Sequence, residues 1–310
     1  MHFTPFWIMI EGRKPIYHDL RNSSGWREDG NRPAYGYQFT KEESEMRGRR
    51  WSVSRRIYGG RGRGGRGLTG NQLKSLGGLF LLMDHIGAVV IQGGILHGRG
   101  REAILAAVST ELGQRLLLAA QILRYAGRLA FPIFAFLLTE GFIHTRDRVR
   151  YIIRMGALAL ISEPFFDMAI YGTWFYADYQ NMILTLWIGL LMLTALELSV
   201  HPAQQILALL AGCGLSWLLR TDYNVLGILL IGALYWFRYN DTARLFWGMI
   251  LSALESLSCF CISALAYAPI VLYNGRRGAR EWKYVYYAFY PVHLALLYFI
   301  AGWAARKVGI

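Results

Sequence analysis

The stretch KSLGGLFLLMDHIGAVV, residues 74–90, is the segment that decides the fold class. It is apolar over most of its length, and an α-helix needs about 20 mainly apolar residues to cross the hydrocarbon core of a bilayer. Further stretches of the same character follow it along the chain. The candidate membrane spans are 75–96, 126–144, 151–171, 182–200, 203–220, 224–238, 245–273 and 284–305. The sequence therefore predicts an all-α, polytopic integral membrane bundle with about eight to ten transmembrane helices.

Composition divides the chain into two parts. Hydrophobic residues make up 54% of the 310 residues and charged residues 17%, whereas a soluble domain usually has about 25% charged residues. Residues 1–70 are polar, and they contain the Gly- and Arg-rich run RRWSVSRRIYGGRGRGGRG at residues 49–67. Because such a run cannot bury a core, we expect a disordered basic tail over 1–70 and a membrane domain over 71–310.

Two interpretations of the basic tail are open. It could contact anionic lipid or nucleic acid, or it could be a solvated extension that helps to fix the orientation of the membrane domain. We favour the second interpretation and expect no nucleic-acid partner, because nothing in the tail suggests a folded DNA-binding module.

Two stretches leave the number of spans open. Residues 103–123 carry charges at their centre, so an amphipathic helix lying in the membrane interface competes with a span. Residues 245–273 contain Glu255 and Pro269 and could form one long helix or two short ones.

The placement of Lys and Arg predicts the orientation, because cytoplasmic loops of membrane proteins are enriched in these residues. The basic tail places the N-terminus in the cytoplasm, and the Arg-rich loop 146–150 is expected on the same side. The aromatic loop 171–180, which has no basic residue, is expected at the outer face. The basic cluster at 276–283 is cytoplasmic only if 245–273 crosses twice. We therefore expect a multi-pass protein of the inner (cytoplasmic) membrane.

Ionisable side chains inside the apolar stretches mark a candidate site. A charged residue at the centre of a membrane helix costs about 2.5–3.5 kcal/mol on insertion scales, and such residues usually face a cavity or a partner. Lys74 and His85 are separated by about three helical turns, which puts them on one face and about 16 Å apart along the axis. This spacing suits a lysine at the membrane surface and a histidine deeper in the same groove. The alternative is that Asp84 and His85 pair with other helices and hold the bundle together.

A second group of ionisable residues lies between positions 127 and 167. Its members are Arg128, Glu140, His144, Arg154, Glu163 and Asp167. Glu140 and His144 are four residues apart and share one helical face. Pro164 is expected to kink its helix and free a carbonyl, which is a common way to open a polar pocket. Structural ion pairs explain one or two of these charges, but they explain the whole group less well.

Several motifs in a fixed order resemble the TraX family over roughly residues 71–305. In chain order they are KSLGGLFLLMDHIGAV, GRLAFPIFAFLLTEGFIHTRD, ISEPFFD, QNMILTLWIGLL, TDYNVLGILLI, LYNGRRG and YPVHL. Members of this family resemble the conjugative-plasmid protein that acetylates the N-terminus of F-type pilin at the inner membrane. The spacing of Lys74 and His85 is also similar to the Arg-x10-His signature of membrane O-acyltransferases that use acetyl-CoA, although Lys replaces Arg here.

The resemblance implies a membrane acyltransferase that moves an acetyl or other acyl group from acyl-CoA, with acetyl-CoA as the donor substrate. This chemistry needs a general base, cations for the donor's phosphates and a group that stabilises the oxyanion. We expect His85 to be the base, oriented by Glu163 or Asp84. The residues expected to bind the substrates are Lys74, Arg128, Glu140, His144, Arg154, Asp167, Asn181 and His293.

The expected roles divide along the bundle. Lys74 and Arg154 would bind the phosphates at the cytoplasmic side, and Arg128 would hold the acceptor near the outer face. The acceptor is either a pilin-like protein with an N-terminal amine or a hydroxyl of a sugar or other small molecule. No metal is expected, because Cys259 and Cys261 are two residues apart on one helix and point in different directions.

Two other functions stay open. Intramembrane acids and histidines also form proton relays, so a proton-coupled secondary transporter is the main alternative. Inverted repeats would favour a transporter, and the two halves of the sequence show no clear self-similarity. A helper protein without catalysis would leave the clustered charges of the early spans harder to explain.

Overall fold

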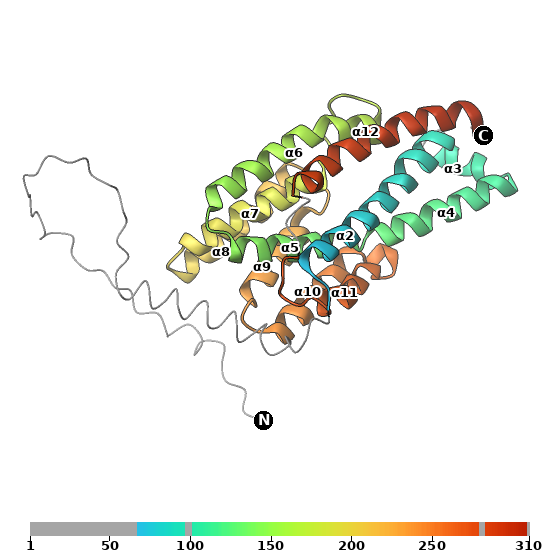
Figure 1. The fold of residues 1–310 in the computed structure, drawn as a ribbon. Helices are drawn as coiled ribbons and strands as arrows, with labels where there is room; N and C mark the ends of the chain where they lie inside the picture. The colour runs from blue at the N-terminus through green and yellow to red at the C-terminus, as the bar shows by residue number, and fades with distance from the viewer. Residues whose placement is uncertain (1–66, 97–100, 279–282, 309–310) are drawn as a thin grey trace, which may run out of the picture. The chain divides into compact units, whose positions relative to one another are not determined.

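The computed structural model describes residues 67–96, 101–278 and 283–308, and these residues are almost entirely helical (Figure 1). The long helices are α2 (Gly70–His85), α4 (Glu111–Gly127), α5 (Ala130–His144), α6 (Arg148–Tyr171), α7 (Met182–Leu198), α8 (Pro202–Leu218), α9 (Asn224–Trp236), α10 (Asp241–Glu255) and α12 (Lys283–Val308). The shorter elements are α3 (Arg101–Val108), the 3-10 turns η3 (Leu257–Cys259) and η4 (Ile262–Ala266), and α11 (Tyr267–Val271). The prediction of an all-α bundle is confirmed. The predicted tail over 1–70 lies almost wholly outside the described residues.

Three helical segments in the described part of the chain are long and apolar enough to cross a membrane. They are Gly70–Ile95, Glu111–His144 and Val285–Lys307. Several of the other predicted spans fold into apolar helices shorter than a bilayer is thick, such as α7 and α9. The protein is therefore a helical membrane protein, with three segments of spanning length and apolarity among its described residues.

The first long segment changes its winding near its middle. After α2 the chain continues as a π-helix, η2, over Ile86–Ile95. Thr69 begins the segment as the N-cap of α2, and it forms a reciprocal capping box with Gln72. The π-helix packs against α4 and α12, so the second half of this segment is enclosed by two other helices.

The stretch 103–123 is divided between α3 and α4, with the break at Thr110, whose side chain caps α4. α4 packs against α2 and η2, and Gly127 at its end contacts the Asp84 side chain. This segment is therefore packed into the bundle and leads directly into α5, rather than lying alone in the interface.

The stretch 245–273 reverses direction. α10 ends at Glu255, whose carboxylate meets Arg128 just before α5. The chain then returns through η3, η4 and α11 to Tyr273, which pairs with Leu68 just before α2. The return places the basic residues after 275 beside the start of α2. They therefore lie at the same end of the bundle as the beginning of the first span, as expected if both face the cytoplasm.

The centre of the bundle is formed by α5, α7 and α9, whose side chains are apolar on nearly every face. A helix that is apolar all round belongs in the interior of its fold. α2, α6 and α12 pack around this centre, and the space that they leave is the candidate site.

Candidate functional site

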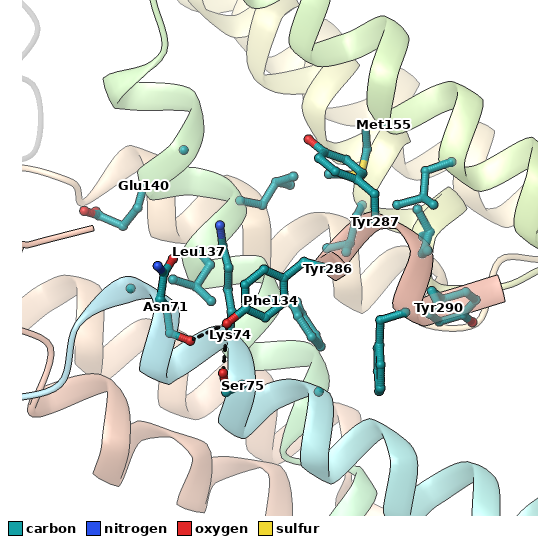
Figure 2. Close-up of a pocket in the computed structure, with 18 of the residues that line it drawn as sticks. Asn71, Lys74, Ser75, Phe134, Leu137, Glu140, Met155, Tyr286, Tyr287 and Tyr290 are labelled. Atoms are coloured by element: carbon teal, nitrogen blue, oxygen red, sulfur yellow. Dashed lines mark hydrogen bonds between the residues drawn. The ribbon is translucent and has the colours of Figure 1, made fainter. Parts of the chain in front are cut away.

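A cavity of about 750 Å³ lies between α2, α5, α6, α7 and α12 (Figure 2). One end is formed by the beginning of α2, the end of α5 and the loop after Tyr273. We call this the basic end, because it carries Lys74, His144, Arg154 and Arg277. The opposite end is buried and consists of Met182, Ile183, Leu186 and Tyr290, and we call it the inner end. The cavity thus changes from cationic and partly exposed to apolar and enclosed.

Lys74 extends from α2 beside Tyr286 of α12, and Figure 2 shows the two side chains together. The Lys74 Nζ atom lies 5.7 Å from the centre of the Tyr286 ring. The Tyr286 hydroxyl donates to the backbone carbonyl of Asn71 at 3.2 Å and lies 2.9 Å from the Ser75 hydroxyl. These contacts tie α12 to α2 and hold the wall of the basic end in place.

A buried ion pair lies at the basic end of the cavity and includes Glu140, which lines it. The Arg244 Nη1 donates to the Glu140 Oε1 at 2.7 Å, and both side chains are almost completely buried. The Arg244 guanidinium also lies over the Phe136 ring at 4.6 Å. The His144 Nδ1 lies 2.8 Å from the Glu140 backbone carbonyl, which it binds as a donor when the proton is on Nδ1. This bond leaves Nε2 as the basic nitrogen of a neutral His144 ring.

Glu163 lies next to the inner end and is held by Asn181. The Asn181 side-chain amide donates to the Glu163 carboxylate, and the Asn181 backbone N–H donates to it at 3.2 Å. The Asn181 side-chain oxygen accepts from the N–H of Ile183 at 2.8 Å, so Asn181 is the N-cap of α7. Because Met182 lines the cavity, Glu163 binds the residue that directly precedes the cavity wall.

Asp167 lies one turn after Glu163 and faces the loop that follows α6. Its side chain is fully buried, and its Oδ2 accepts from the Tyr176 backbone N–H at 2.8 Å. Its Oδ1 has no hydrogen-bond partner among the described residues.

The structure places His85 outside the cavity lining. Its Nδ1 lies 2.8 Å from the His293 Nε2, and the His293 Nδ1 lies 2.7 Å from the Phe289 carbonyl. Asp84, one of the groups expected to orient His85, pairs with Arg124 at 2.8 Å. The side chain that contacts the His85 ring is therefore His293, whereas the sequence analysis expected Asp84 or Glu163. The sequence does not show that α12 packs beside His85.

Arg128 also lies away from the cavity. It pairs with Glu255 at 3.3 Å, and Ser263 donates to the second oxygen of that carboxylate at 3.1 Å. The single Ser263 hydroxyl proton is shared between this oxygen and the Arg128 carbonyl, which lies 3.0 Å from the Ser263 Oγ. This arrangement fits the structural alternative, in which intramembrane charges hold helices together.

A pair of loops closes the end of the bundle that is furthest from the basic end. Gln180 and Thr221 pair through their backbones, and the Tyr179 hydroxyl donates to the Asp222 carboxylate. Burial raises the pKa of Asp222, and Arg128 opposes that increase. These contacts anchor one side of the loop between α6 and α7.

The predicted residues thus fall into three groups. Four line the cavity, namely Lys74, Glu140, His144 and Arg154. Three adjoin its inner end or the loop beyond it, namely Glu163, Asp167 and Asn181. Four form contacts elsewhere in the bundle, namely Asp84, His85, Arg128 and His293.

Sequence reasoning missed Arg244, Arg277 and Tyr290 as site residues. Arg244 directly precedes the candidate span 245–273, outside the apolar stretches in which the sequence analysis looked for ionisable residues. An arginine followed directly by LFWGMIL was the available signal of a buried charge. Arg277 belongs to the basic cluster 276–283, from which the sequence analysis inferred only the orientation in the membrane.

The fold and the cavity define a class: a helical membrane protein with a polar-ended cavity inside its bundle. The sequence model described as "TraX protein" matches residues 69–301, and the chain therefore belongs to the TraX family. A curated relative, described as "Probable fimbrial assembly protein FimC, serogroup H1" of Dichelobacter nodosus, is 30% identical over 202 residues. That match covers 57% of this chain and 82% of the relative. No solved structure matches the chain.

Proposed function

We propose that this protein is a membrane acyltransferase that moves an acetyl or other acyl group from acyl-CoA to an amine of a pilin-like protein. The observation that carries the proposal is the polarity of the cavity, which has cations at its exposed end and an apolar interior. An acyl-CoA has the matching polarity, because its phosphates are at one end and its acyl group is at the other. The family and the name of the fimbrial relative favour a pilin-like acceptor.

The basic end suits the phosphates of the donor. Lys74, Arg154 and Arg277 supply three cations from three different elements. Arginine forms bidentate bonds to phosphate, and lysine acts as a compact point charge. A volume of about 750 Å³ falls within the range of small-molecule sites and suits the narrow arm and acyl group of the donor.

Two groups serve the reaction in this proposal, namely Tyr290 at the inner end and Glu163, which lies beside that end and outside the cavity lining. Glu163 accepts a proton from the attacking amine, whose nitrogen forms a bond to the carbonyl carbon. The Tyr290 hydroxyl, which is buried at the inner end beside Met182, donates to the developing oxyanion. The carbon–sulfur bond then breaks, and the proton passes to the departing sulfur, so that the products are an amide and a thiol.

His85 does not line the cavity but contacts Tyr290, which does. Its ring contacts the Tyr290 ring edge-on at 5.9 Å, and it is bonded to His293. The role of base that the sequence predicted for His85 therefore passes to Glu163 in this proposal, and His85 supports Tyr290.

The orientation completes the proposal. We place the basic end at the cytoplasmic face of the inner membrane, where acyl-CoA is available, and the α6–α7 loop at the outer face. The Arg-rich positions after α5 and after Tyr273 lie at the basic end, in agreement with the distribution expected for cytoplasmic loops.

The test is a transfer assay with the purified full chain in lipid nanodiscs. Radiolabelled acetyl-CoA is incubated with a peptide copied from the N-terminus of a pilin, and label in the peptide is counted. We expect Glu163→Gln to lower kcat by about a hundredfold or more, as loss of a general base does. Glu111→Gln, which changes an exposed acid of α4, is the matched control. If the wild-type protein neither transfers label nor hydrolyses acetyl-CoA, the proposed function is wrong.

A further inference from the structure

Asp167 is the feature of this bundle that the proposed reaction does not use. It lies one turn before the end of α6, its side chain is fully buried, and one carboxylate oxygen has no partner among the described residues. A buried carboxylate is costly unless it is paired with a cation or fully hydrogen-bonded. The bond from the Tyr176 N–H satisfies only one of the two carboxylate oxygens.

A second carboxylate lies on the same face of α6. Glu163 precedes Asp167 by one helical turn, and it accepts bonds from Asn181 but forms no ion pair with a described Lys, Arg or His. Two acidic side chains one turn apart repel each other when both are ionised. A cation placed beside them would remove this repulsion and satisfy the free oxygen of Asp167.

Aromatic residues of α6 and of the loop that binds Asp167 pack on one another. Tyr171 and Tyr176 stack with their ring centres 3.9 Å apart, and Phe166 and Tyr179 lie parallel at 6.3 Å. Aromatic faces attract ammonium groups, and they also exclude water from the ion pair. The chemistry of the surroundings therefore suits an organic ammonium better than a hydrated metal ion.

The cover over Asp167 is a short, exposed loop. It begins at Gly172, whose φ of 72° favours glycine, and it is anchored again from Asp178, which pairs with Arg220. Between these points Trp174 and Phe175 are 72% and 74% exposed. Exposed aromatic side chains are typical of membrane interfaces, where the end of a membrane-anchored protein would arrive.

We propose that Asp167 and Glu163 form a binding site for the N-terminal ammonium group of the acceptor polypeptide, under the loop 172–177. This inference deepens the proposed function and rests on it for the fate of the amine. The site adjoins the inner end of the cavity, because Glu163 binds Asn181 and the next residue, Met182, lines the cavity. The acceptor thus enters from the loop side, and the donor enters from the basic end.

The test measures binding in the absence of any donor. The full chain is placed in nanodiscs of phosphatidylcholine and phosphatidylglycerol, which lack primary amines. The probe is a short peptide with a free N-terminal glycine, and the comparison is the same peptide with an acetylated N-terminus. We expect the free peptide to bind at least about tenfold more tightly, since bonds to charged groups have about this effect on affinity.

Two variants assign the preference to Asp167. Asp167→Asn, which keeps the shape of the side chain, should remove the tenfold preference. Glu111→Gln, which changes an exposed acid of α4 and leaves the loop and its anchors unchanged, should retain it. A wild-type protein that binds both peptides equally, or an Asp167→Asn protein that still prefers the free amine, overturns the inference.

A measurement on the wild-type protein alone guards against misfolding of the variant. The preference should disappear as the pH rises above about 8, where an α-amino group loses its charge. A preference that persists well above that pH contradicts an ammonium site. The result is separable from the transferase proposal: binding without transfer refutes the transferase, and transfer without amine preference refutes this site.

Discussion

At the scale of single residues, the Glu140–Arg244 pair shows what the sequence could not foresee. The position of Glu140 within an apolar stretch marked it as important, but its partner lies on α10, 104 residues later. Periodicity places residues on one face of one helix, as it did for Glu140 and His144, and it carries no information about which other helix that face meets. The interhelical partners of His85, Asp84 and Arg128 were unpredictable for the same reason.

Removing one partner of this buried pair should be strongly destabilising. Arg244→Met leaves the Glu140 carboxylate buried without its cation, and we expect a loss of about 3–5 kcal/mol in the free energy of unfolding. The measurement is denaturant unfolding in detergent micelles. Arg115→Met, which breaks an exposed pair on α4, is the control and should cost at most about 1 kcal/mol. Equal effects of the two substitutions would refute the structural role given to the pair.

The cations of the basic end should control donor binding rather than turnover. Replacing Lys74, Arg154 or Arg277 with Gln removes one charge-assisted contact, and we expect each change to raise the KM for acetyl-CoA by about tenfold. Arg150→Gln is the control, because Arg150 lies on α6 outside the cavity and pairs with exposed Asp147. Steady-state kinetics decide the point, and an unchanged KM in all three variants would argue against phosphate binding there.

At the scale of elements, most helices were predictable, but the change to a π-helix was not. Apolar length located α5, α7 and α9 to within a few residues, because a buried helix is apolar on all sides. The change from α2 to a π-helix has no comparable signal, whereas the break at Thr110 has a local one, an N-cap threonine followed by Glu111. The π-helix packs against α4 and α12, so its position depends on tertiary contacts.

Close packing of α2 on α4 gives a prediction at this scale. A Cβ atom added at Gly127 would lie 2.3 Å from the Asp84 Cβ, so Gly127→Ala should force the two helices apart and destabilise the protein by about 1–3 kcal/mol. Gly214→Ala on α8 is the matched control, because nothing lies within 4 Å of the added atom. It should leave stability unchanged or raise it by up to about 1 kcal/mol. Thermal unfolding of the two variants in detergent provides the comparison, and the opposite order of stabilities would contradict the packing.

At the scale of the whole molecule, the distribution of charge predicted the return of the chain through 257–271. The charge rule required the stretch 245–273 to cross twice, and the structure brings Tyr273 back beside Leu68. The chain therefore returns to the end of the bundle where α2 begins, which agrees with the two-helix alternative for 245–273. The cavity itself could not be foreseen, since its wall combines residues from five helices.

The proposed orientation can be tested by labelling introduced cysteines in intact cells. The native Cys213, Cys259 and Cys261 are first replaced by Ser, and a single cysteine is placed at Thr173 or at Arg276. A membrane-impermeant maleimide should label the cysteine at 173 in intact cells and the cysteine at 276 only after the membrane is opened. Labelling with the reverse pattern would place the basic end outside the cell and contradict the orientation.

The central claim is that the cavity holds the acyl end of the donor at its inner end, and photochemical cross-linking tests it most directly. An acyl-CoA analogue with a diazirine on its acyl group is photolysed with the protein in nanodiscs, and the modified residues are found by mass spectrometry. We predict adducts on the inner lining, at Met155, Leu158, Ile183 or Leu186, and their loss when acetyl-CoA competes. Adducts that acetyl-CoA removes but that lie outside the cavity, or no competed adduct at all, would contradict the claim.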